Sequence, residues 1–303
     1  MPPTPGGNSL DIHKIRAART AYYAIARKRM TAPGAFHPKV ATVAQTSKDV
    51  SVSLWLSRHP RMRKWTSGPK LKKKFRVGSD RITTDPYESS VMVPVDDIEN
   101  DDFGMWSEAI GNMGQAYPEA LDTLAATLLN NAFNSTYGTS YDGQNLIDTD
   151  HTTIAGGSNQ SNLVTGALSA TTLDLAFRRF GEMVDEEGQP MPRKPKTLTV
   201  GFQNRDVARK LLGQDALASG ETNMNKGILS LEISPFITGT NWFVTVEGSA
   251  ALVIHVKKRP IWLAVDDPNG DFRFETASHK YGIEAEFGGK PGMWEDIVGG
   301  TGA

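Results

Sequence analysis

The sequence predicts an α+β protein, because segments with helical spacing of apolar residues occur together with runs that alternate as strands do. Residues 103–133 and 171–187 place apolar side chains at steps of three and four. From residue 197 onward the chain is mostly short strand-like runs separated by turn residues. The sequence has neither an internal repeat nor a heptad array. We therefore expect helices together with mainly antiparallel sheet.

The N-terminal segment predicts a helix that needs a partner surface. Residues 1–8 are rich in proline and glycine and are expected to be extended or disordered. Ser9 is a candidate N-cap for a helix that runs to about Met30. A modest apolar stripe follows this helix and consists of Leu10, Ile12, Ile15, Ala18, Tyr22, Ile25 and Ala26. Because the stripe cannot be buried by the helix alone, we expect the helix to dock as an arm, on another copy of the chain rather than on its own molecule.

Residues 70–96 predict a long β-hairpin. The segment LKKKFRVGS forms its first limb, RITTDPYE its turn and SSVMVPV its second limb. The first limb is strongly basic and has few apolar residues. Since an isolated hairpin is marginally stable in water, we expect this one to lie on a partner surface.

An acidic segment and a long helix come next. Residues 96–102, DDIENDD, supply carboxylates that suit a helix N-terminus, because they meet the positive end of the helix dipole. The apolar stripe that follows consists of Phe103, Trp106, Ile110, Met113, Tyr117, Leu121, Leu124, Ala125, Leu128, Leu129, Ala132 and Phe133. Pro118 is expected to kink or restart this helix. About 30 residues of helix would be roughly 45 Å long, which indicates a structural backbone for the fold.

The rest of the chain predicts loops, two shorter helices and a series of strands. Residues 134–166 are loop-like, and a helix at 171–187 is capped by Thr171 or Thr172 and ended by Gly188. After the linker PMPRKP come the strand TLTVGF and the short helix NRDVARKLLG. The remaining strands are SLEISPFI, NWFVTVEG, ALVIHVKKRPIWLAV and YGIEAEFGG, with the turn DDPNGD leading into FRFETAS, and the chain ends in MWEDIVGG.

Composition excludes several classes of protein. The chain has no cysteine, which rules out disulfides, thiolate metal sites and a cysteine nucleophile, and which fits a reducing cytoplasm. No apolar run approaches the roughly 20 residues that cross a bilayer, and the N-terminus MPPTPGGNSL does not resemble a secretory signal. We therefore expect no membrane partner.

Charge is distributed very unevenly along the chain. Residues 1–81 contain 18 lysines and arginines and three acidic residues, whereas residues 82–177 contain 14 acidic residues and no lysine or arginine. One explanation is that the basic part of one copy lies on the acidic part of another, since such complementarity steers association. Pairing within one molecule, or two separately solvated faces, explains the same distribution.

Candidate catalytic and metal-binding groups are weak. His151 with Asp148 and Asp150 lies in a Thr- and Gly-rich loop without a second anchored set of ligands, so loop hydrogen bonding explains it. The segment DDPNGD at 266–271 resembles part of a calcium loop but lacks the glutamate at the twelfth position, and it predicts a hairpin turn. No nucleophile elbow such as G-x-S-x-G is present. We expect neither a cofactor nor a metal, and no enzyme activity.

Two functions of other classes remain open at this point. A hydrolase built around His151 is one alternative, although the motif context is missing. A nucleic-acid-binding protein that uses the basic N-terminal block is another, and it predicts steeply salt-dependent affinity for DNA.

An ordered series of segments resembles the phage Mu-like major head subunit (gpT) family. The segments are LWLSRHPRMRKWTSGPKLKKKFRVGS, VPVDDIENDDFGMWSEAIGNMGQAYPEALDTLAATLL, YDGQNLIDTDHT and NLVTGALSATTLDLAFRRFGEMVDEEGQPMPRKPKTLTVGFQNRDVARKLLG. The resemblance extends from about Val40 to Ile297. The family often has an aromatic residue after Tyr-Asp-Gly-Gln, where this chain has Asn145-Leu146-Ile147.

The resemblance implies the tailed-phage capsid fold of the Hong Kong 97 type. Residues 1–50 would form an N-terminal arm, and residues 51–95 an extended β-hairpin loop with its lead-in. Residues 96–195 and 272–303 would form a peripheral domain with a long spine helix. Residues 196–271 would form an axial domain.

The same resemblance implies contacts between copies of the chain. Basic residues of the extended loop would face acidic residues of an adjacent copy; they are Arg63, Lys64, Lys70, Lys72, Lys73, Lys74 and Arg76 on one side, and Asp96, Asp97, Glu99, Asp101 and Asp102 on the other. Many copies, as hexamers and pentamers, would close into an icosahedral shell.

The implied function is that of a major capsid protein, without catalysis. The shell would be part of a virion assembled in the host bacterial cytoplasm and would hold packaged genomic double-stranded DNA without sequence specificity. Portal, scaffolding and decoration proteins are further implied partners. An encapsulin-like protein nanocompartment shares the fold and is the alternative function.

Overall fold

The computed structural model describes residues 8–31, 36–56, 77–99, 104–214 and 223–302, together with residues 64, 65, 67, 68 and 72. Residues 1–7, expected to be extended or disordered, lie outside this part. The helices are α1 (Asn8–Met30), α2 (Val95–Glu99), α3 (Met105–Asn130), α4 (Ala170–Glu182), α5 (Arg205–Gly213) and α6 (Asp271–Thr276), with 3-10 helices η1 (His37–Lys39), η2 (Phe202–Asn204) and η3 (Trp294–Asp296). The strands are β1 (Ala41–Gln45), β2 (Val50–Leu56), β3 (Val77–Thr83), β4 (Asp85–Pro94), β5 (Leu163–Val164), β6 (Pro195–Val200), β7 (Ser230–Ile233), β8 (Trp242–Val246), β9 (Leu252–Val265), β10 (Ser278–Pro291) and β11 (Ile297–Gly300).

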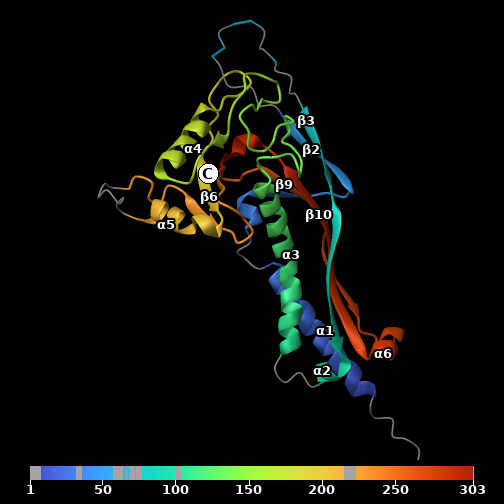
Figure 1. The fold of residues 1–303 in the computed structure, drawn as a ribbon. Helices are drawn as coiled ribbons and strands as arrows, with labels where there is room; N and C mark the ends of the chain where they lie inside the picture. Colours follow the sequence, from blue (N-terminus) through green and yellow to red (C-terminus); the bar gives the residue numbers. More distant parts are fainter. Residues whose placement is uncertain are drawn as a thin grey trace, which may run out of the picture.

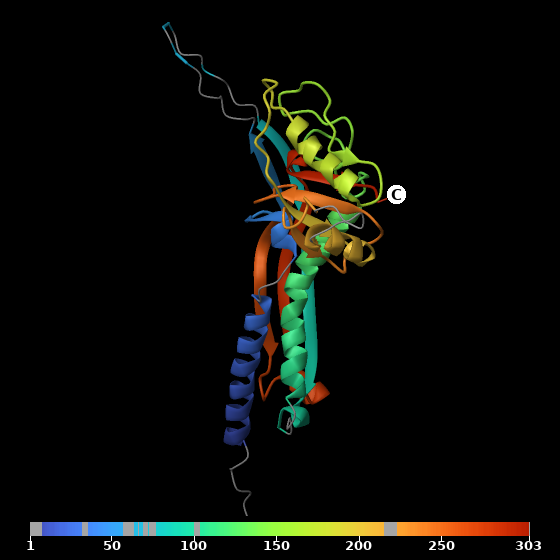
Figure 2. The same ribbon diagram turned by 90° about the vertical axis from the view of Figure 1, so that its left-hand side faces the viewer.

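The strands form three sheets, with the orders β1-β9-β10-β4, β5-β11-β8-β6-β7 and β2-β3. Three of the described pairs are parallel, β1–β9, β5–β11 and β6–β7, and the others are antiparallel. The α+β class with mainly antiparallel pairing is confirmed. The molecule is elongated: the five-stranded sheet with α4 and α5 lies at one end, and α1, α3 and the long strands extend to the other (Figures 1 and 2).

The long helix α3 is the central support of the elongated part. Its 26 residues correspond to roughly 39 Å at 1.5 Å per residue. Leu121, Ala125 and Leu129 are buried in a cluster shared with β9 and β10. Pro118 lies inside α3, which continues through it as one element, so the expected restart at Pro118 does not occur. Packing on both sides of the proline keeps the two halves on one sheet.

The described part of the acidic segment lies at the N-terminus of a different helix from the one predicted, and Asp101 and Asp102 lie outside the described residues. Asp96 and Asp97 lie in the first turn of the separate short helix α2. The residue before α3 is Gly104, with φ of +65°, a left-handed conformation that interrupts the path between the two helices. Glu108 is the acidic residue in the first turn of α3.

Helix α1 docks on its own chain. Ile15, Tyr22 and Ala26 are buried, and the rings of Tyr22 and Tyr281 meet edge to face at 5.3 Å. A Cβ atom at Gly114 of α3 would lie 2.5 Å from the carbonyl oxygen of Ala26, so the two helices approach closely. The expected helix is therefore confirmed. The expectation that its apolar face finds cover only on another copy is wrong, because α3 and β10 of the same chain cover it.

The predicted hairpin within residues 70–96 is wrong in its pairing. β3 pairs with β2, with Val50 opposite Thr83 and Leu56 opposite Val77. β4 pairs instead with β10 along its whole length, and its Val93 is completely buried. RITTDPYE is therefore not a turn. The chain continues from β3 directly into β4, and β4 pairs with β10 instead of folding back onto β3. Most of the connection between β2 and β3, residues 57–76, lies outside the described residues.

Helix α4 differs from its predicted limits, and a further short helix occurs where none was predicted. The N-cap of α4 is Ser169, whose hydroxyl accepts from the Thr172 N–H at 3.2 Å, while the Thr172 hydroxyl accepts from the Ser169 N–H at 2.9 Å. α4 ends at Glu182, before the predicted limit of 187. The segment after the turn DDPNGD forms the helix α6, which was not predicted, and Ala277, with φ of +50°, connects α6 to β10.

The division into a peripheral and an axial domain stays a prediction. The pairing of β9 with β10 crosses the predicted boundary between residues 271 and 272. The pairing of β11 with β8 also joins the two predicted domains, because β11 lies in the predicted peripheral part and β8 in the predicted axial part. Any such division must therefore allow two sheets to be shared between its parts.

Candidate functional site

The β2–β3 sheet joins the rest of the molecule through a contact that we call the hairpin root, formed by Asp49, Ser51, Ser53, Asp80, His255, Lys257, Gly288 and Lys290. Both nitrogens of His255 on β9 meet hydroxyls of β2. Nδ1 contacts the Ser51 hydroxyl, and Nε2 lies 3.1 Å from the Ser53 hydroxyl. Ser51 and Ser53 are buried, so these hydrogen bonds are shielded from water.

Ion pairs flank the two serines. Lys290 Nζ on β10 lies 2.5 Å from the Asp80 carboxylate of β3. Lys257 pairs with Asp49 and lies 2.5 Å from Glu286. The hairpin root therefore fixes the β2–β3 sheet to β9 and β10, at the end of the molecule opposite α2 (Figure 1).

Burial also controls the charge of the histidine at the hairpin root. It lowers the pKa of His255, so the neutral imidazole is the favoured form. A neutral ring accepts a hydrogen bond at one nitrogen and donates one at the other, which matches one hydroxyl on each side. The hairpin root consequently needs no charge at position 255.

The predicted charged contact residues are only partly described. Lys64 and Lys72 are exposed, Asp96 is exposed and Asp97 is half-buried. Glu99 ends α2, and its side chain is outside the description. Arg63, Lys70, Lys73, Lys74, Arg76, Asp101 and Asp102 all lie outside the described residues. α2 and the β2–β3 sheet occupy opposite ends of the elongated molecule (Figure 1).

Sequence reasoning missed the hairpin root. Ser51 and His255 are 204 positions apart, and Asp80 and Lys290 are 210 apart. The sequence around each of these residues is typical of an ordinary strand, so no local signal indicates the contact. Only the alternation in β2, which places Ser51 and Ser53 on one face, marks a polar face there.

A second polar cluster is buried under the five-stranded sheet. His151 is completely buried; its Nδ1 lies 2.8 Å from Asp142, and its ring stacks on Trp294 at 4.6 Å. The predicted neighbours Asp148 and Asp150 are therefore not its partners. The Tyr141 hydroxyl donates to Glu295 at 2.5 Å. Because the imidazole is enclosed by this packing, a substrate has no access to it.

Two carboxyl groups of this cluster, those of Glu295 and Asp296, are buried and have raised pKa values. Burial raises the pKa of Glu295 to about 7 and also raises the pKa of Asp296. Arg193 counteracts both shifts, with its guanidinium 2.6 Å from Asp296. Burial, and then the charge of Glu295, raises the pKa of Tyr141. The cluster is a structural link between the loop at 141–151 and the C-terminal segment.

Metal and membrane sites were sought in the described parts of the chain. There, no set of three or more histidine and carboxylate side chains is placed to hold a metal ion. None of the helices described combines the length and apolar character needed to cross a bilayer.

Solved structures similar to this chain include phage capsids and a virus-like particle. The JBD30 procapsid subunit has a TM-score of 0.56 at 19% identity, covering 94% of this chain and 74% of that chain. The Ralstonia phage GP4 capsid has a TM-score of 0.57 at 14% identity, covering 88% of each chain. A virus-like particle from Pyrococcus furiosus has a TM-score of 0.52 at 11% identity, covering 95% and 98%. The fold is the tailed-phage capsid fold of the Hong Kong 97 type.

The sequence gives the narrower assignment. The profile of the Mu-like prophage major head subunit gpT matches residues 15–167 and 161–237, and the chain belongs to this family. The major capsid protein of Escherichia phage Mu is 28% identical over 113 residues, which are 37% of this chain and 36% of that protein. The Mu-like prophage FluMu major head subunit of Haemophilus influenzae is 28% identical over 129 residues, 42% of this chain and 41% of that protein. The matched segments thus span about two fifths or less of these relatives.

Proposed function

We propose that this chain is the major capsid protein of a tailed bacteriophage. Many copies, as hexamers and pentamers, close into an icosahedral shell around packaged double-stranded DNA, and the chain catalyses no reaction. The observation that carries the proposal is the match of the gpT family to residues 15–237. The fold shared with phage capsids over most of the chain supports it. The family match favours a phage shell over a protein nanocompartment of the same fold.

Electron microscopy of the purified chain tests the proposal directly. We expect closed shells, tubes or free capsomers in negative stain, because a capsid subunit buries its contact surfaces on other copies. Packaged DNA would be measured as nuclease-resistant nucleic acid in particles from infected cells. A chain that sediments as a single copy at every concentration would contradict the proposal.

The finer partners belong to the same proposal. The shell would assemble in the host bacterial cytoplasm and become part of the virion, with portal, scaffolding or decoration proteins as auxiliary partners. Basic residues of the extended loop would contact acidic residues around α2 of an adjacent copy. The positions of the β2–β3 sheet and α2 at opposite ends of one molecule support a contact between copies rather than within one (Figure 1).

Charge reversal in the loop is expected to weaken assembly. Replacing Lys72, Lys73 and Lys74 with glutamate would place like charges opposite the acidic residues of a neighbour, so particle yield on a gradient should fall at low salt. Partial recovery is expected near 1 M salt, where screening shortens to about 3 Å.

A matched control separates this contact from net charge. Lys194, Lys196 and Lys210 are exposed and lie far along the chain from the loop, so their replacement by glutamate should leave the yield nearly unchanged. Normal assembly of the Lys72, Lys73 and Lys74 variant at both salt concentrations would rule the contact out.

A further inference from the structure

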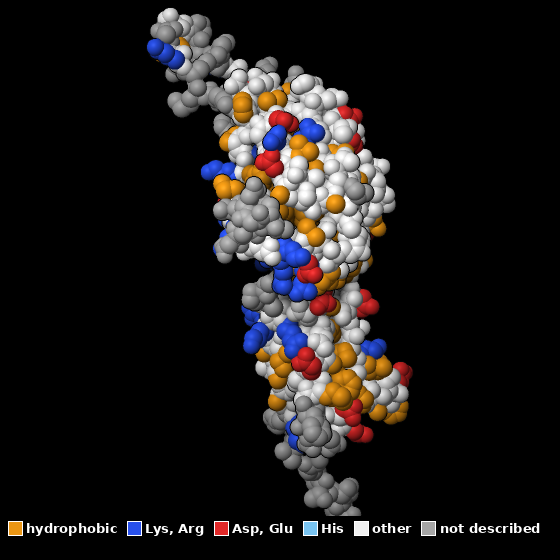
Figure 3. Space-filling model, turned by 60° about the vertical axis from the view of Figure 1, so that its left-hand side comes forward, with side chains coloured by type: hydrophobic (Ala, Val, Ile, Leu, Met, Phe, Trp, Pro, Cys, Tyr) orange, Lys and Arg blue, Asp and Glu red, His pale blue; other side chains and the backbone are white. Residues whose placement is uncertain are grey.

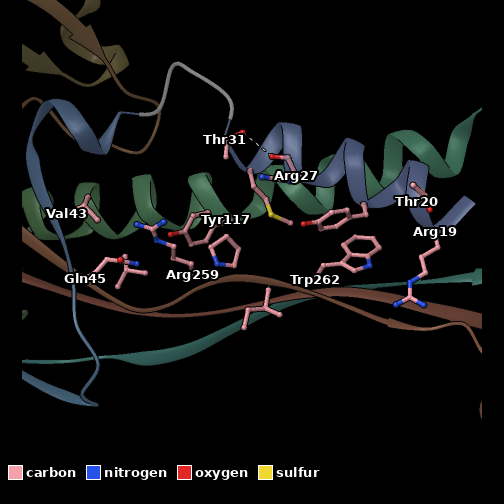
Figure 4. Close-up of a pocket in the computed structure, with 14 residues that line it drawn as sticks. Arg19, Thr20, Arg27, Thr31, Val43, Gln45, Tyr117, Arg259 and Trp262 are labelled. Atoms are coloured by element: carbon pink, nitrogen blue, oxygen red, sulfur yellow. Dashed lines mark hydrogen bonds between the residues drawn. The ribbon is translucent and has the colours of Figure 1, made fainter. Parts of the chain in front are cut away.

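A groove of about 890 Å³ runs between α1 and the edge of β9, next to the end of β1 (Figure 4). β1 pairs with β9 only over Leu252 to Val256, so beyond that point α1 rather than a strand borders this side of β9. The lining contains three arginines and no acidic residue; its charged and aromatic members are Arg19, Arg27, Arg259, Tyr23, Tyr117 and Trp262. The groove is therefore cationic and aromatic.

The positive charges of the groove arginines are only partly balanced by carboxylates of the same chain. Arg19 reaches Asp266 at 3.4 Å and remains half exposed. Arg27 and Arg259 have no carboxylate partner among the residues that the structure describes. In the close-up, Arg259 lies beside Tyr117, and Arg27 extends from α1, the opposite wall of the groove (Figure 4). Lysine and arginine side chains also gather around the middle of the molecule on the face shown in Figure 3.

Apolar surface lies beside these charges. Tyr23, Val43 and Ile261 keep 42–46% of their surface exposed although all three line the groove. The ring of Tyr23 meets Trp262 edge to face at 6.1 Å, so an aromatic wall is already in place. Tryptophan, tyrosine and arginine are the residues that contribute most binding energy at protein interfaces.

The groove does not favour an added strand. Pro260 has no N–H to donate, and the register of β9 against β10 shifts between Glu284 and Glu286, opposite this part of β9. Proline and bulges protect an exposed sheet edge from strand pairing. An occupant is therefore recognised by its side chains, through carboxylates on the arginines and apolar groups on the aromatic wall.

We propose that this groove binds an acidic segment of a second copy of this chain, drawn from residues 82–177. That block has no lysine or arginine, and its exposed carboxylates include Asp85, Glu88 and Glu119, which complement a groove with three arginines and no acid. The inference rests on the proposed function, because shell assembly is what brings a second copy to the groove. It places the acceptor for the acidic block on α1 and β9, separate from the loop lysines.

Photo-crosslinking tests the occupant. A diazirine amino acid at Thr20, an exposed residue of the groove, would be activated in particles and in concentrated soluble protein made from mixed ¹⁵N-labelled and unlabelled chains. Mass spectrometry should find crosslinked peptides of mixed label that join Thr20 to residues 82–177. The same amino acid at Lys14, exposed on α1 outside the groove, is the control and should give few such products.

Charge reversal in the groove is the second test of the proposal. The Arg27→Glu, Arg259→Glu double variant should lower the mixed-label crosslinks at least tenfold, whereas the Lys14→Glu, Arg16→Glu double variant, with the same change of charge, should not. Inter-copy crosslinks confined to other segments, or crosslinks to nucleic acid or to a different protein, would overturn the inference. So would particles that form without any mixed-label product, and in that case the shell function itself would stand. The absence of any assembly would instead count against the shell function.

Discussion

Replacing Gly288 with alanine is expected to destabilise the protein by about 3 kcal/mol or more, the upper part of the range for overpacked cores. A Cβ atom at this position would lie 1.9 Å from the Thr83 carbonyl oxygen and 3.2 Å from the Thr84 Cα. Both obstacles are backbone atoms at the end of β3, so no side-chain rotation relieves the contact. The β2–β3 sheet must move away from β10, and the hydrogen bonds of the hairpin root are lost with it.

Urea unfolding monitored by circular dichroism measures this loss, and microscopy measures particle formation. Gly181→Ala is the matched control, because a Cβ at Gly181 in α4 meets no atom within 4 Å. In a helix that substitution should stabilise by up to about 1 kcal/mol. If the two alanine variants unfolded at the same urea concentration, the close approach of β10 to the β3 end would not hold.

The Arg193→Met variant is expected to lose about 3–5 kcal/mol of stability, as when one partner of a buried ion pair is removed. Arg193 lies 2.6 Å from Asp296, whose side chain is 5% exposed, and Glu295 is adjacent and also buried. Methionine keeps much of the arginine's apolar stem but leaves the buried carboxylates without a counter-charge. The substitution therefore isolates the electrostatic contribution.

The loss should be larger at pH 8 than at pH 5. Glu295 has a folded-state pKa of about 7, above its ordinary value of 4.5, so the folded state holds this proton between the two values. A raised acidic pKa means that stability is lost as the pH rises through this window. At pH 5 the arginine mainly balances Asp296, whereas at pH 8 it balances two carboxylates.

Unfolding at both pH values checks this dependence. Arg178→Met is the control, since the Arg178–Asp174 pair on α4 is 70% and 60% exposed and such pairs contribute only about 0.3–0.5 kcal/mol. A loss in the Arg193 variant no greater than in the Arg178 variant, or equal at the two pH values, would refute the role assigned to the guanidinium.

Local pattern was enough for most elements. The stripe from Trp106 to Leu129 predicted α3, and the strands β6 to β10 follow runs of apolar and β-branched residues. These elements were predictable because the periodicity of a helix or a strand depends only on residues that are close together in the sequence. Where the partner strand is distant, the same reasoning failed: β3 and β4 were taken as one hairpin, although their partners are β2 and β10.

The periodicity of apolar residues and the ordered series of family segments are properties of the sequence by itself, and they determined the fold class and the expected role in a shell. Three contacts were decided only by the tertiary structure. Helix α1 packs on α3 of the same chain, His151 pairs with Asp142, and the His255 ring hydrogen-bonds to the hydroxyls of Ser51 and Ser53. The physical reason is that each of these contacts depends on how sheets and helices pack. That packing brings together residues more than 200 positions apart, as in the contact of Ser51 with His255, and no spacing along the chain encodes it.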